Sequence, residues 1–172
     1  MEGLIAARVL HVLGVVVWIG GVALVTTVLL PATRRMTTPA ARLQFFESIE
    51  RRFATQARIT TLVTGASGLY LVHALDLWQR FAHVEYWWMH SMVAVWAAFT
   101  LVLFVVEPLV HRKSSKKLTN PGDAGESGSP AQRDPKRAFA RIVRLHWALL
   151  VVSLVTIAGA VAGSHGYLLF SR

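Results

Sequence analysis

The stretch LIAARVLHVLGVVVWIGGVALVTTVLL, residues 4–30, is apolar except for Arg8, His11 and two threonines. A helix needs about 20 residues to cross a hydrocarbon core roughly 30 Å thick, so this stretch can cross a membrane with residues to spare. It lacks a basic head and is too long for a cleaved signal peptide, so we expect it to remain in the protein. The stretch therefore predicts a membrane-spanning helix.

The composition of the whole chain agrees with a membrane protein. Of its 172 residues, 54% are hydrophobic and 16% are charged, whereas a soluble domain carries about 45–50% apolar and about 25% charged residues. The absence of cysteine excludes disulfides, thiolate zinc sites, iron–sulfur clusters and c-type haem attachment. We predict an all-α integral membrane four-helix bundle that forms a single domain over residues 1–172. Its spans are expected at about residues 4–30, 59–75, 87–106 and 142–169.

The positive charges predict the orientation of these spans. Fifteen of the eighteen Lys and Arg residues lie in or beside the connections between spans one and two and between spans three and four. Cytoplasmic loops carry an excess of such residues. Both termini and the short second connection are therefore expected outside, which is an N-out, C-out topology.

The two basic connections differ in character. Residues 38–58 are amphipathic and predict a helix that runs into the second span. Residues 114–134 are rich in Gly, Ser, Pro and Lys and predict a disordered cytoplasmic linker. The charges in both connections are interpreted as topology determinants at an anionic leaflet. No folded module is predicted to present them, so we expect no nucleic-acid binding.

Four of the seven histidines fall towards the outer leaflet in this topology, one from each span: His11, His73, His90 and His165. An ionisable side chain at membrane depth is a functional-site hypothesis by default, and neutral imidazole binds haem iron, copper and zinc. We therefore predict a redox metal site at this outer histidine cluster. His11 and His90 lie deepest and are the first candidates as ligands. For His73 and His165 an interfacial position is equally consistent.

The neighbours of His11 favour a site on its face of the helix. Arg8 lies one turn before it and is expected either to hold a haem propionate or to extend to the lipid headgroups. Gly14, Trp18 and Gly21 follow on the same face. Small residues there would admit a flat macrocycle or another helix.

Glu107 is the one acidic residue within reach of the membrane interior. We predict that it forms an ion pair with Arg58, Arg144 or His146, and a proton-relay role is the alternative. Interfacial aromatic belts are predicted for Trp78, Trp87, Trp88 and Trp147.

Several short motifs resemble a known family. The motifs Leu10-His11, Trp18-Ile-Gly-Gly21 and Leu29-Leu-Pro31 resemble the first helix of the copper-resistance protein D (CopD) family. The motifs Arg51-Arg-Phe53, Thr64-Gly-Ala-Ser-Gly68-Leu-Tyr-Leu and Trp87-Trp-Met-His90 resemble spans two and three of the same superfamily. That superfamily includes the HemJ-type protoporphyrinogen oxidases, which are small haem b membrane proteins. The resemblance covers most of residues 4–110.

The resemblance implies a cofactor and some of its ligands. In the HemJ type, the histidine that matches His11 is implicated in haem ligation. The third-span motif of that type is Trp-x-His-x-Lys, whereas this chain has Trp88-Met-His90-Ser-Met92, with Met92 in place of the lysine. The resemblance thus implies haem b on His11 with His90, or His90 and Met92 as soft metal ligands. It does not imply protoporphyrinogen oxidation.

Three functions are consistent with these observations. The first is haem b held by His11 and His90 in the bacterial inner membrane, exchanging electrons with a quinol or a periplasmic redox protein. The second is copper binding or transport across that membrane, in contact with a periplasmic copper protein. The third is a cofactor-free assembly subunit of the membrane. No hydrolase or kinase motif is present, and whether a haem would be catalytic stays open. The Gly-rich faces of spans two and four would either close the bundle or form a homodimer.

Overall fold

The structure is a computed structural model that describes residues 1–33, 38–109 and 135–167. These residues are all-helical, as predicted, and contain no strand. The elements in chain order are α1 (Glu2–Leu24), η1 (Val25–Leu29), α2 (Leu30–Thr33), α3 (Pro39–Ala74), η2 (Trp78–Ala82), η3 (Val84–Tyr86), α4 (Trp87–Leu101), η4 (Val102–Val106) and α7 (Pro135–Ser164). Segments η1 and η4 are π-helical, and η2 and η3 are short 3₁₀-helices. The predicted linker, residues 114–134, lies outside the described residues.

Three helical stretches of the described chain are long and apolar enough to cross a membrane: Glu2–Thr33, Val84–Leu109 and Phe139–Ser164. This indicates a membrane protein. The second predicted span is the C-terminal part of α3 and is not among the three. Four hydroxyl side chains between residues 60 and 67 lower its hydropathy. A bundle of four membrane spans therefore stays a prediction, whereas the helix expected over residues 38–58 does continue into this segment as α3.

The last helix ends earlier than the sequence predicts. Helix α7 stops at Ser164 because Gly166 adopts a left-handed conformation with φ of 84°. The backbone N–H of Tyr167 then donates to the carbonyl of Ala162 at 3.1 Å. This pattern is a common way to end a helix, and glycine accepts it without steric cost.

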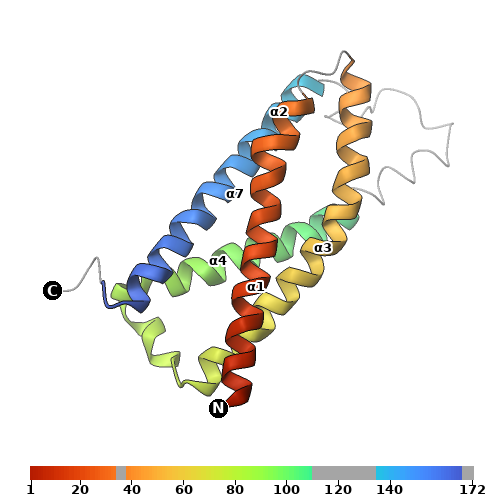
Figure 1. The fold of residues 1–172 in the computed structure, drawn as a ribbon. Coiled ribbons are helices and arrows are strands. Elements are labelled where there is room, and N and C mark those ends of the chain that lie inside the picture. Colours follow the sequence, from red (N-terminus) through yellow and green to blue (C-terminus); the bar gives the residue numbers. More distant parts are fainter. Residues whose placement is uncertain (34–37, 110–134, 168–172) are drawn as a thin grey trace.

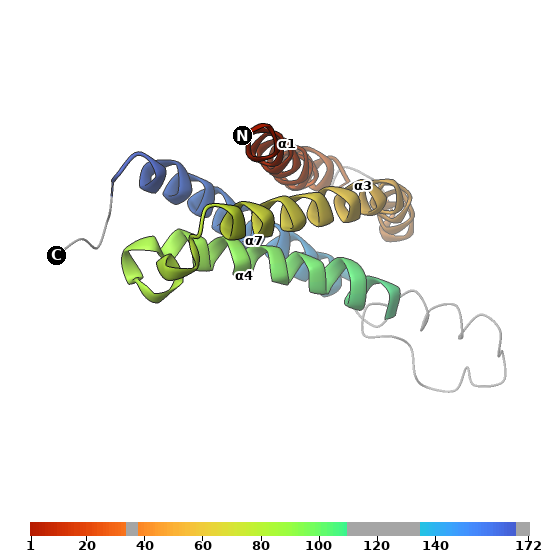
Figure 2. The ribbon, with the colours of Figure 1, turned by 90° about the horizontal axis from the view of Figure 1, so that it is seen from below.

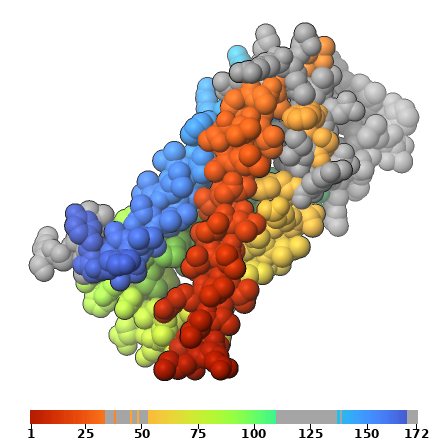
Figure 3. Space-filling view, in the orientation of Figure 1, coloured from red at the N-terminus to blue at the C-terminus, as the bar shows by residue number. Residues whose placement is uncertain are grey.

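The helices form two pairs, α1 with α3 and α4 with α7, and α3 lies between α1 and α4 (Figure 2). The N-terminus, the η2–η3 connection and the end of α7 lie at one end of the molecule (Figure 1). Helix α2 and the starts of α3 and α7 lie at the opposite end. We call these the outer and inner ends, after the predicted topology. Helices α1 and α7 lie side by side near the inner end and diverge towards the outer end (Figure 3).

The core lies where α1, α4 and α7 meet. Trp18 is only 3% exposed, and its ring packs edge-on against Phe99 with the ring centroids 4.8 Å apart. Ile19 and Val22 of α1, Val95 of α4 and Leu150 of α7 complete this cluster. Edge-on aromatic pairs add about 0.5–1.5 kcal/mol to the contact area that they bury. The cluster therefore ties the α1–α3 pair to the α4–α7 pair.

Aromatic rings pack against glycines of neighbouring helices. A Cβ atom on Gly21 would overlap the Phe53 ring, and one on Gly65 would overlap the indole of Trp96. The Trp96 Nε1–H donates to the Thr61 carbonyl at 2.9 Å, which fixes the ring against α3. Because these glycines lack a side chain, the aromatic rings pack directly against the helix backbone. Small residues let membrane helices approach each other in the same way.

The same arrangement joins α4 to α7. Cβ atoms on Gly159 and Gly163 would overlap the rings of Trp87 and Trp88. Trp88 is only 5% exposed as a result. The prediction of an interfacial belt is therefore wrong for Trp88, because the glycines of α7 provide a buried position for its ring.

Two neighbouring glycines of α1 test this packing. Gly21→Leu should lower the free energy of unfolding by about 1–3 kcal/mol, since the new side chain collides with Phe53. Gly20→Leu should leave it nearly unchanged, because a Cβ on Gly20 meets no atom within 4 Å. Reversible unfolding of the purified variants in mixed micelles measures the difference. Equal losses in the two variants would contradict the packing described.

Candidate functional site

His11 lies in the contact between α1 and α3. Its Nδ1 is 3.0 Å from the carbonyl oxygen of Thr64 and 3.4 Å from Ser67 Oγ. A Cβ on Gly68 would come within 3.0 Å of the His11 ring. Because a carbonyl oxygen can only accept a hydrogen bond, the proton lies on Nδ1. The lone pair of the neutral imidazole is therefore on Nε2, which is the arrangement seen in many metal-binding histidines.

A strip of buried hydroxyl groups on α3 surrounds this contact. Thr61, Thr64 and Ser67 are 0%, 5% and 7% exposed. Ser67 Oγ donates to the Val63 carbonyl at 2.6 Å, whereas the hydroxyls of Thr61 and Thr64 have no hydrogen-bond partner among the described residues. Thr64 and Ser67 belong to the sequence motif Thr64-Gly-Ala-Ser-Gly68, and the spacing of three residues places Thr61 on the same helix face.

His90 lies in a different environment, at the start of α4. Its Nε2 is 3.0 Å from the carbonyl oxygen of Phe81 in η2, and its ring lies edge-on to the Phe81 ring with centroids 5.4 Å apart. His90 lines an open hollow in the outer connection together with His83, whose Nδ1 is 3.8 Å from Glu85 Oε1. His90 and His83 therefore line one hollow of the outer connection, whereas His11 lies in the contact between α1 and α3.

The other predicted site residues are dispersed. His73 and Arg8 are exposed, and Met92 is half-buried. His165 is also exposed, and its Nδ1 contacts the Val161 carbonyl of its own helix at 2.8 Å. Within residues 1–33, 38–109 and 135–167, no three His, Asp or Glu side chains lie close enough to bind one metal ion. The structure does not bring the four outer histidines together.

The predicted ion pair of Glu107 is confirmed. Arg58 Nη2 lies 3.1 Å from Glu107 Oε1, and Arg58 Nε donates to the Leu103 carbonyl at 3.2 Å. The two side chains are 35% and 13% exposed. The pair joins α3 to the inner end of α4, and of the three predicted partners Arg58 is the one that the structure places there.

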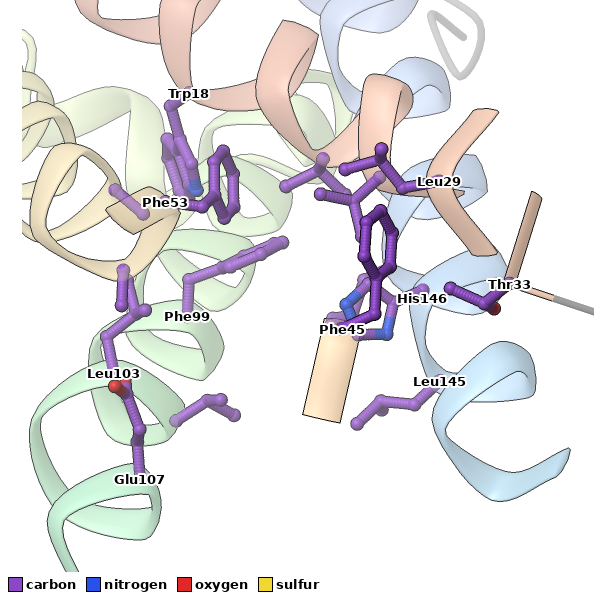
Figure 4. A pocket seen from close by; sticks show the side chains of 16 residues that line it. Trp18, Leu29, Thr33, Phe45, Phe53, Phe99, Leu103, Glu107, Leu145 and His146 are labelled. Carbon is purple, nitrogen blue, oxygen red and sulfur yellow. The ribbon is translucent and has the colours of Figure 1, made fainter. Parts of the chain in front are cut away.

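A cavity near the inner end was not predicted. Its volume is about 110 Å³, and Figure 4 shows the side chains that surround it. It is lined by Trp18, Val22, Val25, Leu29, Thr33, Phe45, Phe53, Ala54, Ala57, Phe99, Val102, Leu103, Glu107, Leu145, His146 and Leu149. The sequence singled out Glu107 and His146 as neighbours at the inner end, but no motif marks the apolar wall because it comes from all four long helices.

Comparison of the chain with protein-family models, with curated proteins and with solved structures finds no match. The relationship to the CopD family and the HemJ type therefore stays a prediction.

The Arg58–Glu107 pair can be tested by a double-mutant cycle. Arg58→Met should lower the free energy of unfolding by about 1–3 kcal/mol, because it removes the guanidinium that pairs with the mostly buried carboxylate of Glu107. Adding Glu107→Gln should recover part of that loss, since a neutral amide is less costly to bury than a charge. Strictly additive losses would show that the two side chains do not interact.

Proposed function

We propose that this chain is a multi-pass protein of the bacterial inner (plasma) membrane that binds a redox-active metal group at its outer side through histidine. The observation that supports this is the hydrogen bond from His11 Nδ1 to the Thr64 carbonyl. It leaves Nε2 as the nitrogen with a lone pair and fixes the orientation of the ring. Metal-binding histidines almost always donate their other N–H to such an acceptor.

The distribution of charge supports the assignment of the outer side. The starts of α3 and α7 lie at the inner end (Figure 1), where the sequence concentrates fifteen of the eighteen Lys and Arg residues. Cytoplasmic connections carry such an excess. His11 and His90 then face the periplasmic half of the membrane, within reach of a periplasmic redox or copper protein.

Haem b is the first candidate group, with His11 as its ligand. In the structure the His11 ring contacts the Thr64 carbonyl and the His90 ring contacts the Phe81 carbonyl. The pair of His11 and His90 stays the predicted ligand set of this haem. A bound haem would supply one-electron chemistry. The side chains of His73, His165 and Arg8, which the sequence also suggested, are exposed and are given no role towards the haem in this proposal.

Copper is the second candidate, and one observation favours it. His83 and His90 line the same hollow of the outer connection, and imidazole nitrogens suit copper. His90 Nε2 donates to the Phe81 carbonyl, which leaves Nδ1 as its ligating nitrogen. The copper ligands proposed here are therefore His83 and His90, in place of the predicted set of His11, His90 and Met92.

Absorption spectroscopy and metal analysis of the purified full chain test these proposals. If haem b binds at His11, the protein shows a Soret band, and His11→Ala lowers the haem content at least tenfold. If copper binds in the outer hollow, the protein retains copper through dialysis, and His90→Ala removes it while His11→Ala does not. His73→Ala is the matched control in both cases, because the His73 side chain is exposed at the end of α3.

The proposal fails if the protein, expressed with haem and copper supplied, retains neither. The chain would then act as a cofactor-free assembly subunit. It also fails if His73→Ala lowers the metal content as much as His11→Ala or His90→Ala, since the site would then lie elsewhere.

A further inference from the structure

The cavity at the inner end has apolar walls and is suited to a flat ring. Four aromatic side chains line it: Trp18, Phe45, Phe53 and Phe99. Figure 4 shows the Trp18 ring reaching from α1 towards Phe53, with Phe99 next to them. Aromatic walls favour stacked or edge-on contact with another ring. Apolar walls between membrane helices also favour a ligand that is dissolved in the lipid.

Polar groups gather on another part of the lining. Glu107, held by Arg58, lies on the α4 side, His146 on α7 and Thr33 at the end of α2. Figure 4 shows Glu107 and His146 on opposite sides of the cavity. The Glu107 carboxylate accepts hydrogen bonds, and so does His146 Nε2, because His146 Nδ1 lies 2.9 Å from the Ile142 carbonyl of its own helix. This combination of apolar walls and a few polar groups is typical of small-molecule sites.

Trp18 adds an unsatisfied donor. Its Nε1–H is buried and has no hydrogen-bond partner among the described residues, although the side chain is only 3% exposed. A buried donor without an acceptor is costly, and the indole nitrogen of a buried tryptophan usually finds one. The Trp18 N–H therefore has no acceptor among the described residues, and a ligand carbonyl would supply one.

Both π-helical segments border the cavity. Val25 and Leu29 belong to η1, and Val102 and Leu103 belong to η4. Single π-helical turns inside α-helices are rare and frequently occur at functional sites. Here two such turns, on different helices, border the same cavity. This observation is independent of the polar lining and also indicates a ligand site.

The size of the cavity limits the ligand to one ring. Its volume of about 110 Å³ far exceeds the 10–15 Å³ or so that one water needs and is of the order of the roughly 150 Å³ cavity that accepts benzene. A macrocycle such as haem is too large. From these observations we infer that the cavity binds the head of a one-ring quinone, whose carbonyls accept hydrogen bonds and whose apolar tail extends into the lipid. This inference does not depend on the metal proposal, because no outer histidine lines the cavity.

Binding can be measured with the full chain in detergent, as the rise in unfolding temperature with the concentration of a 1,4-benzoquinone that carries a decyl tail. Decylbenzene is the control ligand, since it has the same ring size and tail but no carbonyl. The quinone should bind at least tenfold more tightly than decylbenzene. Trp18→Phe keeps a ring but removes the donor and should weaken quinone binding about threefold to tenfold, the equivalent of one neutral hydrogen bond.

A variant that fills the cavity provides a second test. Ala57 is 2% exposed and lines the cavity, so Ala57→Leu should abolish quinone binding. Ala66→Leu is the matched control, because Ala66 is exposed on the same helix. The inference is overturned if decylbenzene binds as tightly as the quinone, which would make the cavity a site for any apolar chain. It is also overturned if folded Ala57→Leu binds the quinone as the unchanged protein does.

Discussion

Close contact between glycines and aromatic rings holds the long helices of this protein in place. Lipid tails are as apolar as the helix surfaces, so the hydrophobic effect does not bring membrane helices together, and dense packing has to do so. The Phe53 ring packs on Gly21 and the Trp96 ring packs on Gly65. Trp87 and Trp88 pack on the two glycines of α7. Each contact fixes the rotation of one helix against its neighbour. The directions in which all other side chains point follow from these rotations.

The contacts that His11 and His90 make are one consequence. Trp88 packs against Gly163 of α7, which fixes the rotation of α4 about its axis. His90, two residues later, then faces η2 and donates its N–H to the Phe81 carbonyl. His11 is turned into the α1–α3 contact, where it meets the Thr64 carbonyl. A second consequence lies at the inner end, where the π-helical segments η1 and η4 follow α1 and α4 and a cavity remains between the helices. The molecule thus has two separate candidate sites, one at each end.

Part of this arrangement could be predicted from the sequence. Long apolar runs predicted the helices, and an acid close to the membrane interior predicted an ion pair, which the contact of Glu107 with Arg58 confirms. The position of a residue along its helix could also be predicted from the sequence. The direction in which its side chain faces could not, because it depends on how the helix is rotated about its axis. His11 and His90 share a predicted depth, but the partners of their rings, the Thr64 and Phe81 carbonyls, could not be predicted. The inner cavity could not be predicted, because its apolar lining is collected from four helices and no segment of the chain carries a motif for it.

The central claim is that α1 packs on α3 in a register that turns His11 into the contact between these two helices. Because the chain has no cysteine, pairs of introduced cysteines can be oxidised without background. The variant Gly14→Cys/Thr64→Cys should form an intramolecular disulfide in membranes, because a Cβ on Gly14 would touch the Thr64 side chain. The variant His11→Cys/His90→Cys should remain reduced under the same conditions. Efficient cross-linking of the second pair, with the first pair unreacted, would contradict the arrangement described.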